Sequence, residues 1–176
     1  MFRSSGTCLV GRKRWGVKSE CSDKAGERQG AIGVALFGKR EKVVSRINRI
    51  LIVEDEPLVA FDNEYVLQDA GYLVVGSVDT VEVAIETIHA GQPHLVLSDI
   101  RLSAGGTGLD VAQAAREAGV PVIFVTGHCP TEAKALAVGC LAKPYTQRDL
   151  LAAIDAVDAK IGGRNPKRMP RGFTLF

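Results

Sequence analysis

Residues 94–102 have the sequence HLVLSDIRL, a short apolar run that ends in an acid. Leu95, Val96 and Leu97 predict a strand buried in a parallel sheet, and Asp99 stands at its carboxyl end. Ligands of open α/β sheets bind in the crevice outside the carboxyl ends of the strands. Asp99 is therefore a candidate site residue, although a single aspartate after a strand more often caps a helix or begins a turn.

The sequence on both sides of this strand alternates between apolar runs and helical patterns. The predicted strands are 50–53, 72–78, 94–98, 121–126 and 141–143, and the predicted helices are 57–70, 81–90, 109–118, 131–138 and 146–161. Gly71, Gly91 and Gly119 follow three of these helices, where glycine commonly ends a helix. The alternation predicts an α/β fold, a doubly wound five-stranded parallel sheet of order 2-1-3-4-5 with five helices in a three-layer sandwich.

Charge divides the chain into three parts. Residues 1–49 hold 12 Lys or Arg against 4 Asp or Glu, residues 50–161 hold 6 against 16, and residues 162–176 hold 4 against none. We expect a basic, disordered N-terminal extension (1–48), a folded domain (49–161) and a basic C-terminal tail (162–176). The extension has few aromatic residues and no DNA-binding motif, which favours a solvated arm, or a leader that is not natively translated, over a nucleic-acid binder.

Apolar runs and cysteines indicate the compartment. No apolar run reaches the ~18 residues of a membrane-spanning helix, so we expect a soluble, cytoplasmic protein. The four cysteines lack CxxC spacing, and we interpret them as thiols in a reducing cytosol. His128 and Cys129 are adjacent, but no paired ligands accompany them, which predicts a loop histidine and a small buried thiol.

A cluster of acids follows the first predicted strand. The predicted strand order places the end of this strand beside Asp99, so Glu54 and Asp55 should converge with it. Clustered carboxylates repel one another, and a hard divalent cation such as Mg²⁺, which takes oxygen ligands, would relieve the repulsion. Taken alone, Glu54, Asp55 and Glu56 are slightly better explained as a negative helix start that complements the helix dipole.

Two other strand ends favour the site interpretation. The fourth predicted strand ends in Thr126, whose hydroxyl can donate to an oxyanion, and the fifth ends in Lys143, whose ammonium suits phosphate. Each residue is ordinary by itself. Together with the acids they predict a site for an anionic group attached to Asp99, with Asp99 as a carboxylate nucleophile.

The spacing of these residues resembles the receiver domain of bacterial two-component response regulators, over about residues 49–161. The resemblance implies that a histidine kinase phosphorylates Asp99, and that the Lys143–Pro144 peptide is cis. It also implies a Mg²⁺ set, Glu54, Asp55, Asp99 and the main-chain carbonyl of Arg101, and a set that contacts the phosphoryl group, Thr126 and Lys143.

Residues 124–129, FVTGHC, resemble the FATGUY signature of a receiver subgroup found largely in alphaproteobacteria and tied to general stress signalling. Val125 replaces the signature alanine, and Ser103 stands where many receivers have proline. Cys140 occupies the place of a tyrosine or phenylalanine that moves on activation in many receivers. Without that aromatic, we expect Thr126 and residues 127–130 to carry the change.

Only 15 residues follow Ile161, too few for an output domain, so we expect output through another molecule. The leading interpretation is a single-domain response regulator that assists its own phosphorylation and dephosphorylation without being an enzyme. Its partners would be a histidine kinase and a phosphotransfer or downstream regulatory protein. One alternative is a magnesium-dependent phosphatase-type enzyme with an aspartyl nucleophile, although residues 100 and 101 supply no second acid. The other is nucleic-acid binding through residues 1–48.

Overall fold

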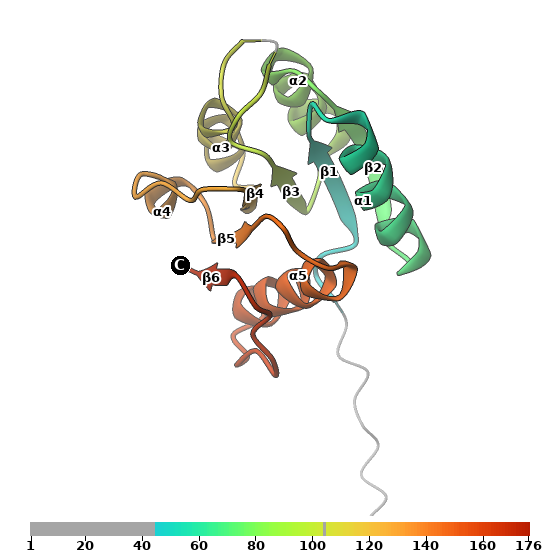
Figure 1. Cartoon of the computed structure of the whole chain (residues 1–176), viewed down its shortest axis with the longest axis vertical. Coiled ribbons are helices and arrows are strands. Elements are labelled where there is room, and N and C mark those ends of the chain that lie inside the picture. Colours follow the sequence, from blue (N-terminus) through green and yellow to red (C-terminus); the bar gives the residue numbers. More distant parts are fainter. Residues whose placement is uncertain (1–44, 104) are drawn as a thin grey trace, which may run out of the picture. The chain divides into compact units, whose positions relative to one another are not determined.

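The computed structural model of the chain describes residues 45–103 and 105–176. The strands are β1 (Arg49–Val53), β2 (Leu73–Val78), β3 (Leu95–Ser98), β4 (Val122–Thr126), β5 (Gly139–Ala142) and β6 (Phe173–Leu175). The helices are α1 (Pro57–Asp69), α2 (Val81–Gly91), α3 (Gly108–Glu117), α4 (Ala133–Leu136) and α5 (Gln147–Ile161). Strands and helices alternate from β1 to α5, as the sequence pattern predicts (Figure 1).

The strands form one sheet of order β2-β1-β3-β4-β5-β6. The five predicted strands are parallel and in the predicted order 2-1-3-4-5. In the pairing of β1 with β3, Val53 lies opposite Ser98. The residues that follow these two, Glu54 and Asp99, therefore leave the sheet at the same edge.

Helices cover both faces of the sheet, which explains the continuous apolar runs of the central strands. One buried cluster joins the sheet to α1 and α5 through residues such as Leu67 and Ile154. The other joins the opposite face to α2, α3 and α4 through Ala84, Val111 and Ala133 (Figure 1). The predicted three-layer sandwich is thus confirmed.

Polar caps fix where several helices begin. The Thr80 side chain accepts from the Val83 N–H at the start of α2. Capping boxes begin α3, between Thr107 and Asp110, and α5, between Thr146 and Asp149.

Helix α4 is shorter than the predicted helix 131–138, and the expected cap at Thr131 is wrong. The N-cap is Glu132, and the helix ends before Ala137, which takes an extended conformation. The Val138 N–H already donates to Val122 O (2.9 Å), so the chain has entered the sheet before the predicted helix end.

Residues 45–48, which the charge pattern places in the extension, pack against the domain. Ile47 is 1% exposed within the cluster that includes α5. The backbone N–H groups of Arg46 and Ile47 donate to Asp158 Oδ1 (2.6 and 3.1 Å), and Arg164 pairs with Asp158 Oδ2 (2.8 Å). The disorder expected for residues 1–44 lies outside the described residues.

The sheet has a sixth strand that the sequence pattern does not predict. β6 pairs antiparallel with β5, with Cys140 opposite Thr174. Gly139 makes room for it, because a Cβ there would lie 2.6 Å from the Phe173 ring. Three residues inside a basic tail give too short an apolar pattern to indicate a strand, yet here they cover the edge of β5.

The prediction that Cys129 is a buried thiol is wrong. Cys129 is exposed, and it forms a disulfide with the buried Cys140. Spacing along the chain does not reveal this pair, because the pairing of β4 with β5 brings the loop after β4 beside Cys140. Cys8 and Cys21 lie outside the described residues.

In the part of the chain that the structure describes, no helix combines the length and apolar character needed to cross a membrane.

Candidate functional site

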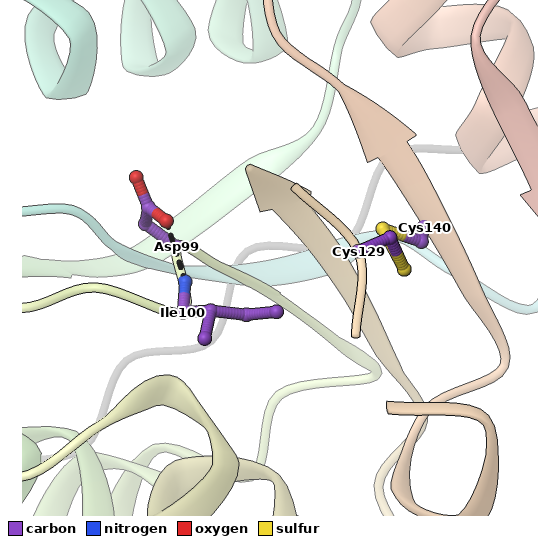
Figure 2. Close-up of a disulfide and its surroundings, with 4 residues drawn as sticks. All are labelled: Asp99, Ile100, Cys129 and Cys140. Carbon is purple, nitrogen blue, oxygen red and sulfur yellow. Dashed lines mark hydrogen bonds between the residues drawn. A yellow bond between two sulfur atoms is a disulfide. The ribbon is translucent and has the colours of Figure 1, made fainter. Parts of the chain in front are cut away.

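Asp99 stands directly after β3, and backbone groups fix its carboxylate. The backbone N–H groups of Ile100 and Arg101 donate to Asp99 Oδ1 (2.5 and 3.1 Å), the first of which is drawn in Figure 2. The Asp99 N–H donates to Val53 O (2.9 Å), which ties the residue to β1. Asp99 is 6% exposed, so the carboxylate is held at a nearly dry edge of the sheet.

Lys143 follows β5 and joins two of the predicted acids. Its Nζ donates to Asp99 Oδ2 (2.7 Å) and to Glu54 Oε2 (2.8 Å). Burial lowers the pKa of Lys143, but the hydrogen bonds to Asp99 and Glu54 and the negative charges of these two carboxylates together raise it by more, so its pKa lies above the ordinary lysine value. The Lys143–Pro144 peptide is cis, as the resemblance implies.

Glu54 is the most buried of the site acids, with 4% of the residue exposed. Burial raises its pKa, and the hydrogen bond from Lys143 opposes this only in part. Its Oε1 is buried and accepts no hydrogen bond from the described residues. Leaving a buried acceptor without a hydrogen bond costs about 1–3 kcal/mol of stability. A cation bound to Glu54 Oε1 would remove this cost.

The Asp55 carboxylate is bound by Ser103, whereas Glu54 and Asp99 share the Lys143 ammonium. Its Oδ2 accepts from the Ser103 N–H (2.9 Å) and from the Ser103 hydroxyl. These bonds lower the pKa of Asp55, the hydroxyl contributing most.

The donor set nevertheless suits Mg²⁺, which prefers carboxylate and carbonyl oxygens. The open Oε1 of Glu54 is the specific feature that fits a cation. Among residues 45–103 and 105–176, no three His, Cys, Asp or Glu side chains are already arranged to hold a metal.

Thr126 and Arg101 flank the acids. Thr126 ends β4, is 2% exposed, and its carbonyl accepts from the Lys143 N–H (2.8 Å). Arg101 follows Asp99 by two residues and pairs with Thr107 across an isolated bridge. All the strand ends named in the sequence pattern therefore meet at one edge of the sheet.

Three supporting features have little or no sequence signal. Gly108 begins α3 against the backbone of Asp99, and a Cβ there would lie 2.0 Å from Asp99 O. The glycine-rich segment after Asp99 hints at this close approach. The Tyr145 hydroxyl donates to Asn63 Oδ1 (2.9 Å), which links α1 to the loop after Lys143. The Ser103–Asp55 contact joins residues 48 positions apart.

The arrangement suits the arrival of a negatively charged group at Asp99. A carboxylate oxygen, the Lys143 ammonium and the Thr126 strand end lie at one edge, and the neighbouring acids can hold a cation. Preorganised charges of this kind stabilise an anionic transition state without further reorganisation.

Comparison with protein families gives a match to the response regulator receiver domain over residues 50–155. The phyllosphere-induced regulator PhyR of Methylorubrum extorquens is 38% identical over 91 residues, which cover 51% of this chain and 34% of PhyR. The transcriptional regulatory protein PdtaR of Mycobacterium tuberculosis is 30% identical over 113 residues, covering 61% of this chain and 55% of PdtaR. The matched region thus spans about a third to a half of these curated relatives.

Solved structures agree with the fold. The crystal structure of a response regulator receiver protein from Sinorhizobium medicae has a TM-score of 0.57 and 32% sequence identity. The match covers 64% of this chain and 94% of that protein.

Proposed function

This chain belongs to the response regulator receiver domain family of two-component signalling proteins, and we propose that Asp99 is its phosphoryl-accepting residue. The observation that carries the proposal is the contact of Lys143 with both Asp99 and Glu54 at the edge of the sheet. The half-buried Lys143 ammonium brings positive charge to the carboxylate that would receive the phosphoryl group, and it offsets the repulsion between two almost fully buried carboxylates.

In the proposed reaction, an Asp99 carboxylate oxygen attacks the phosphorus of a phosphohistidine. The new O–P bond forms as the P–N bond breaks, and the histidine nitrogen keeps the electron pair. The Lys143 ammonium neutralises charge on the transferred oxygens, and the Thr126 hydroxyl donates to one of them. The chain thereby assists its own phosphorylation. Water attacking the same phosphorus would break the bond to the Asp99 oxygen, release inorganic phosphate and restore the carboxylate.

Mg²⁺ would be held by Glu54, Asp55, Asp99 and the main-chain carbonyl of Arg101. When bound, it supplies positive charge to the phosphoryl oxygens. Support for this assignment comes from the open Oε1 of Glu54 and the all-oxygen donor set.

The phosphoryl donor is a histidine kinase that approaches over α1. This helix begins two residues after Asp55, and it exposes a row of large apolar side chains at helical spacing, Leu58 (85%), Phe61 (68%) and Tyr65 (61%). Such a row beside a reactive carboxylate suits a helix that presents a histidine.

Within the family, the chain is of the FATGUY type and acts in the cytoplasm in general stress signalling. Residues 124–129 and the similarity to PhyR support this placement. Output passes by contact with a regulatory protein or by onward phosphotransfer. That the receiver works without an attached output domain stays a prediction. The comparisons lend no support to the phosphatase-type or nucleic-acid-binding alternatives.

Phosphotransfer from a panel of purified histidine kinases tests the proposal. At least one kinase should transfer label rapidly to the wild-type chain and none to Asp99→Asn. Asp69→Asn, a change of an exposed acid at the end of α1, is the matched control and should accept label normally. Equal labelling of Asp99→Asn and the wild type would refute the proposal.

A further inference from the structure

The Cys129–Cys140 pair links the loop after β4 to β5, close to the candidate site. Figure 2 shows Cys129 and Cys140 together with Asp99. Cys140 is 2% exposed and lies in the cluster with Phe124 and Ala133, whereas Cys129 is exposed. The two Cα atoms are 6.4 Å apart, within the range that disulfides require. The backbone therefore places these two sulfurs within bonding reach.

The link closes a ring that contains the whole of α4. The two cysteines are separated by 11 positions, and α4 (Ala133–Leu136) lies between them. The helix has one turn, and its first hydrogen bonds are of the short i→i+3 kind, Ala133 N–H to Pro130 O (3.2 Å) and Ala135 N–H to Glu132 O (3.1 Å). Because α4 has so few backbone hydrogen bonds of its own, its stability depends on the contacts that hold its two ends.

The same link reaches the candidate site through a short connection. Only Gly127 and His128 separate Cys129 from Thr126. On β5, Cys140 lies opposite Phe124 and Ala142 lies opposite Thr126. Lys143 follows Cys140 by three residues. A covalent bond here ties the loop that follows Thr126 to β5, the strand that precedes Lys143.

We propose that Cys129 and Cys140 form a reversible thiol–disulfide switch that controls how readily Thr126 and α4 respond to phosphorylation of Asp99. The coupling to phosphorylation rests on the proposed function, whereas the formation of the bond does not. The disulfide fits the conformation described here. Oxidation therefore favours this conformation over any in which Cys129 moves away from β5.

The oxidant is hydrogen peroxide. The exposed Cys129 thiolate attacks the peroxide, so that an S–O bond forms, the O–O bond breaks and water leaves after protonation. The Cys140 sulfur then attacks Cys129 Sγ, so that the S–S bond forms, the S–O bond breaks and a second water leaves with the Cys140 proton. The two sulfurs lose two electrons to the peroxide. A dithiol reverses the reaction by attack at the exposed Cys129 and supplies two electrons and two protons.

The first experiment tests the bond in the full chain with Cys8→Ser and Cys21→Ser, which leaves only this pair. Hydrogen peroxide should protect both remaining cysteines from alkylation and yield one cross-linked peptide pair within a monomer, and dithiothreitol should restore alkylation. Asp99→Asn should behave identically. Continued alkylation, or cross-links only between two chains, would overturn the proposal.

The second experiment tests the coupling on the same protein. Oxidation should slow phosphorylation by acetyl phosphate with Mg²⁺ about fivefold or more, the lower range of allosteric coupling, and should slow amide exchange in residues 127–138. Cys129→Ser should be phosphorylated at the rate of the dithiol form, both with and without peroxide. Equal rates and equal exchange in both redox forms would overturn the switch and leave the proposed function intact. No phosphorylation of either form would overturn the proposed function and the coupling, but not the bond.

Discussion

Replacing Lys143 with methionine should destabilise the domain in a pH-dependent way. The side chain keeps its length and loses its charge, so Glu54 and Asp99, which are 4% and 6% exposed, lose the ammonium between them. Two hydrogen bonds to charged groups, of 2.7 and 2.8 Å, disappear. Each is worth about 1.5–3 kcal/mol, but Lys143 is partly exposed and Glu54 can take up a proton. We expect a loss of about 2–4 kcal/mol near pH 8.

The dependence on pH follows from Glu54. Its pKa in the folded domain is raised above 4.5 by burial, and Lys143 holds that rise in check. A raised carboxyl pKa means that stability is fully present below the unfolded pKa and is lost as the pH rises through the folded pKa. Methionine at 143 raises the pKa of Glu54 further, so the gap between wild type and Lys143→Met should be small near pH 4.5 and widen toward neutral pH.

Urea unfolding followed by circular dichroism measures this gap at each pH. Lys134→Met, a change of an exposed lysine in α4, is the matched control and should shift stability by less than about 0.5 kcal/mol. A gap that does not change with pH, or one no larger than that of the control, would refute this account of Lys143.

Three further changes probe the rest of the domain. The pKa of Asp158 is lowered below 3.8 despite its burial, because the Arg46 and Ile47 N–H groups and Arg164 bond to it. Asp158→Asn should therefore lower the free energy of unfolding in urea by about 1–3 kcal/mol near neutral pH. This difference between wild type and variant should vanish as the pH falls through the folded pKa of Asp158. A constant difference in acid would contradict this. Gly139→Ala should displace the Phe173 ring and cost about 1–3 kcal/mol, seen as faster amide exchange in residues 173–175, whereas unchanged protection would show that β6 does not depend on this contact. Phe61→Ser should slow transfer from a histidine kinase and leave phosphorylation by acetyl phosphate unchanged; equal slowing of both would place the effect in the site itself.

The fold could be predicted from local sequence because its strands are continuous apolar runs. β1 and β3 are buried on both faces, so nearly every residue in them is aliphatic and their ends are easy to find. The alternation with helices then fixes parallel pairing, and parallel pairing brings strand ends together. This is why Glu54, Asp99, Thr126 and Lys143 could be placed at one edge.

The features that could not be predicted depend on contacts between distant residues. Asp55 binds Ser103, and neither residue type indicates the other. The Cys129–Cys140 pair has no spacing signature, because its geometry comes from β4 and β5 lying side by side. The basic residues around β6 obscure its apolar pattern, and its Phe173 ring needs the space that Gly139 leaves on β5.

The central claim is that Asp99 accepts a phosphoryl group with the help of Mg²⁺. Intact-mass measurement of the full chain after incubation with acetyl phosphate tests this most directly, with and without Mg²⁺. The account predicts one added phosphoryl group that requires Mg²⁺, is released by hydroxylamine as expected of an acyl phosphate, and is absent from Asp99→Asn. Addition of the same mass to Asp99→Asn, or addition that is unaffected by removing Mg²⁺, would contradict it.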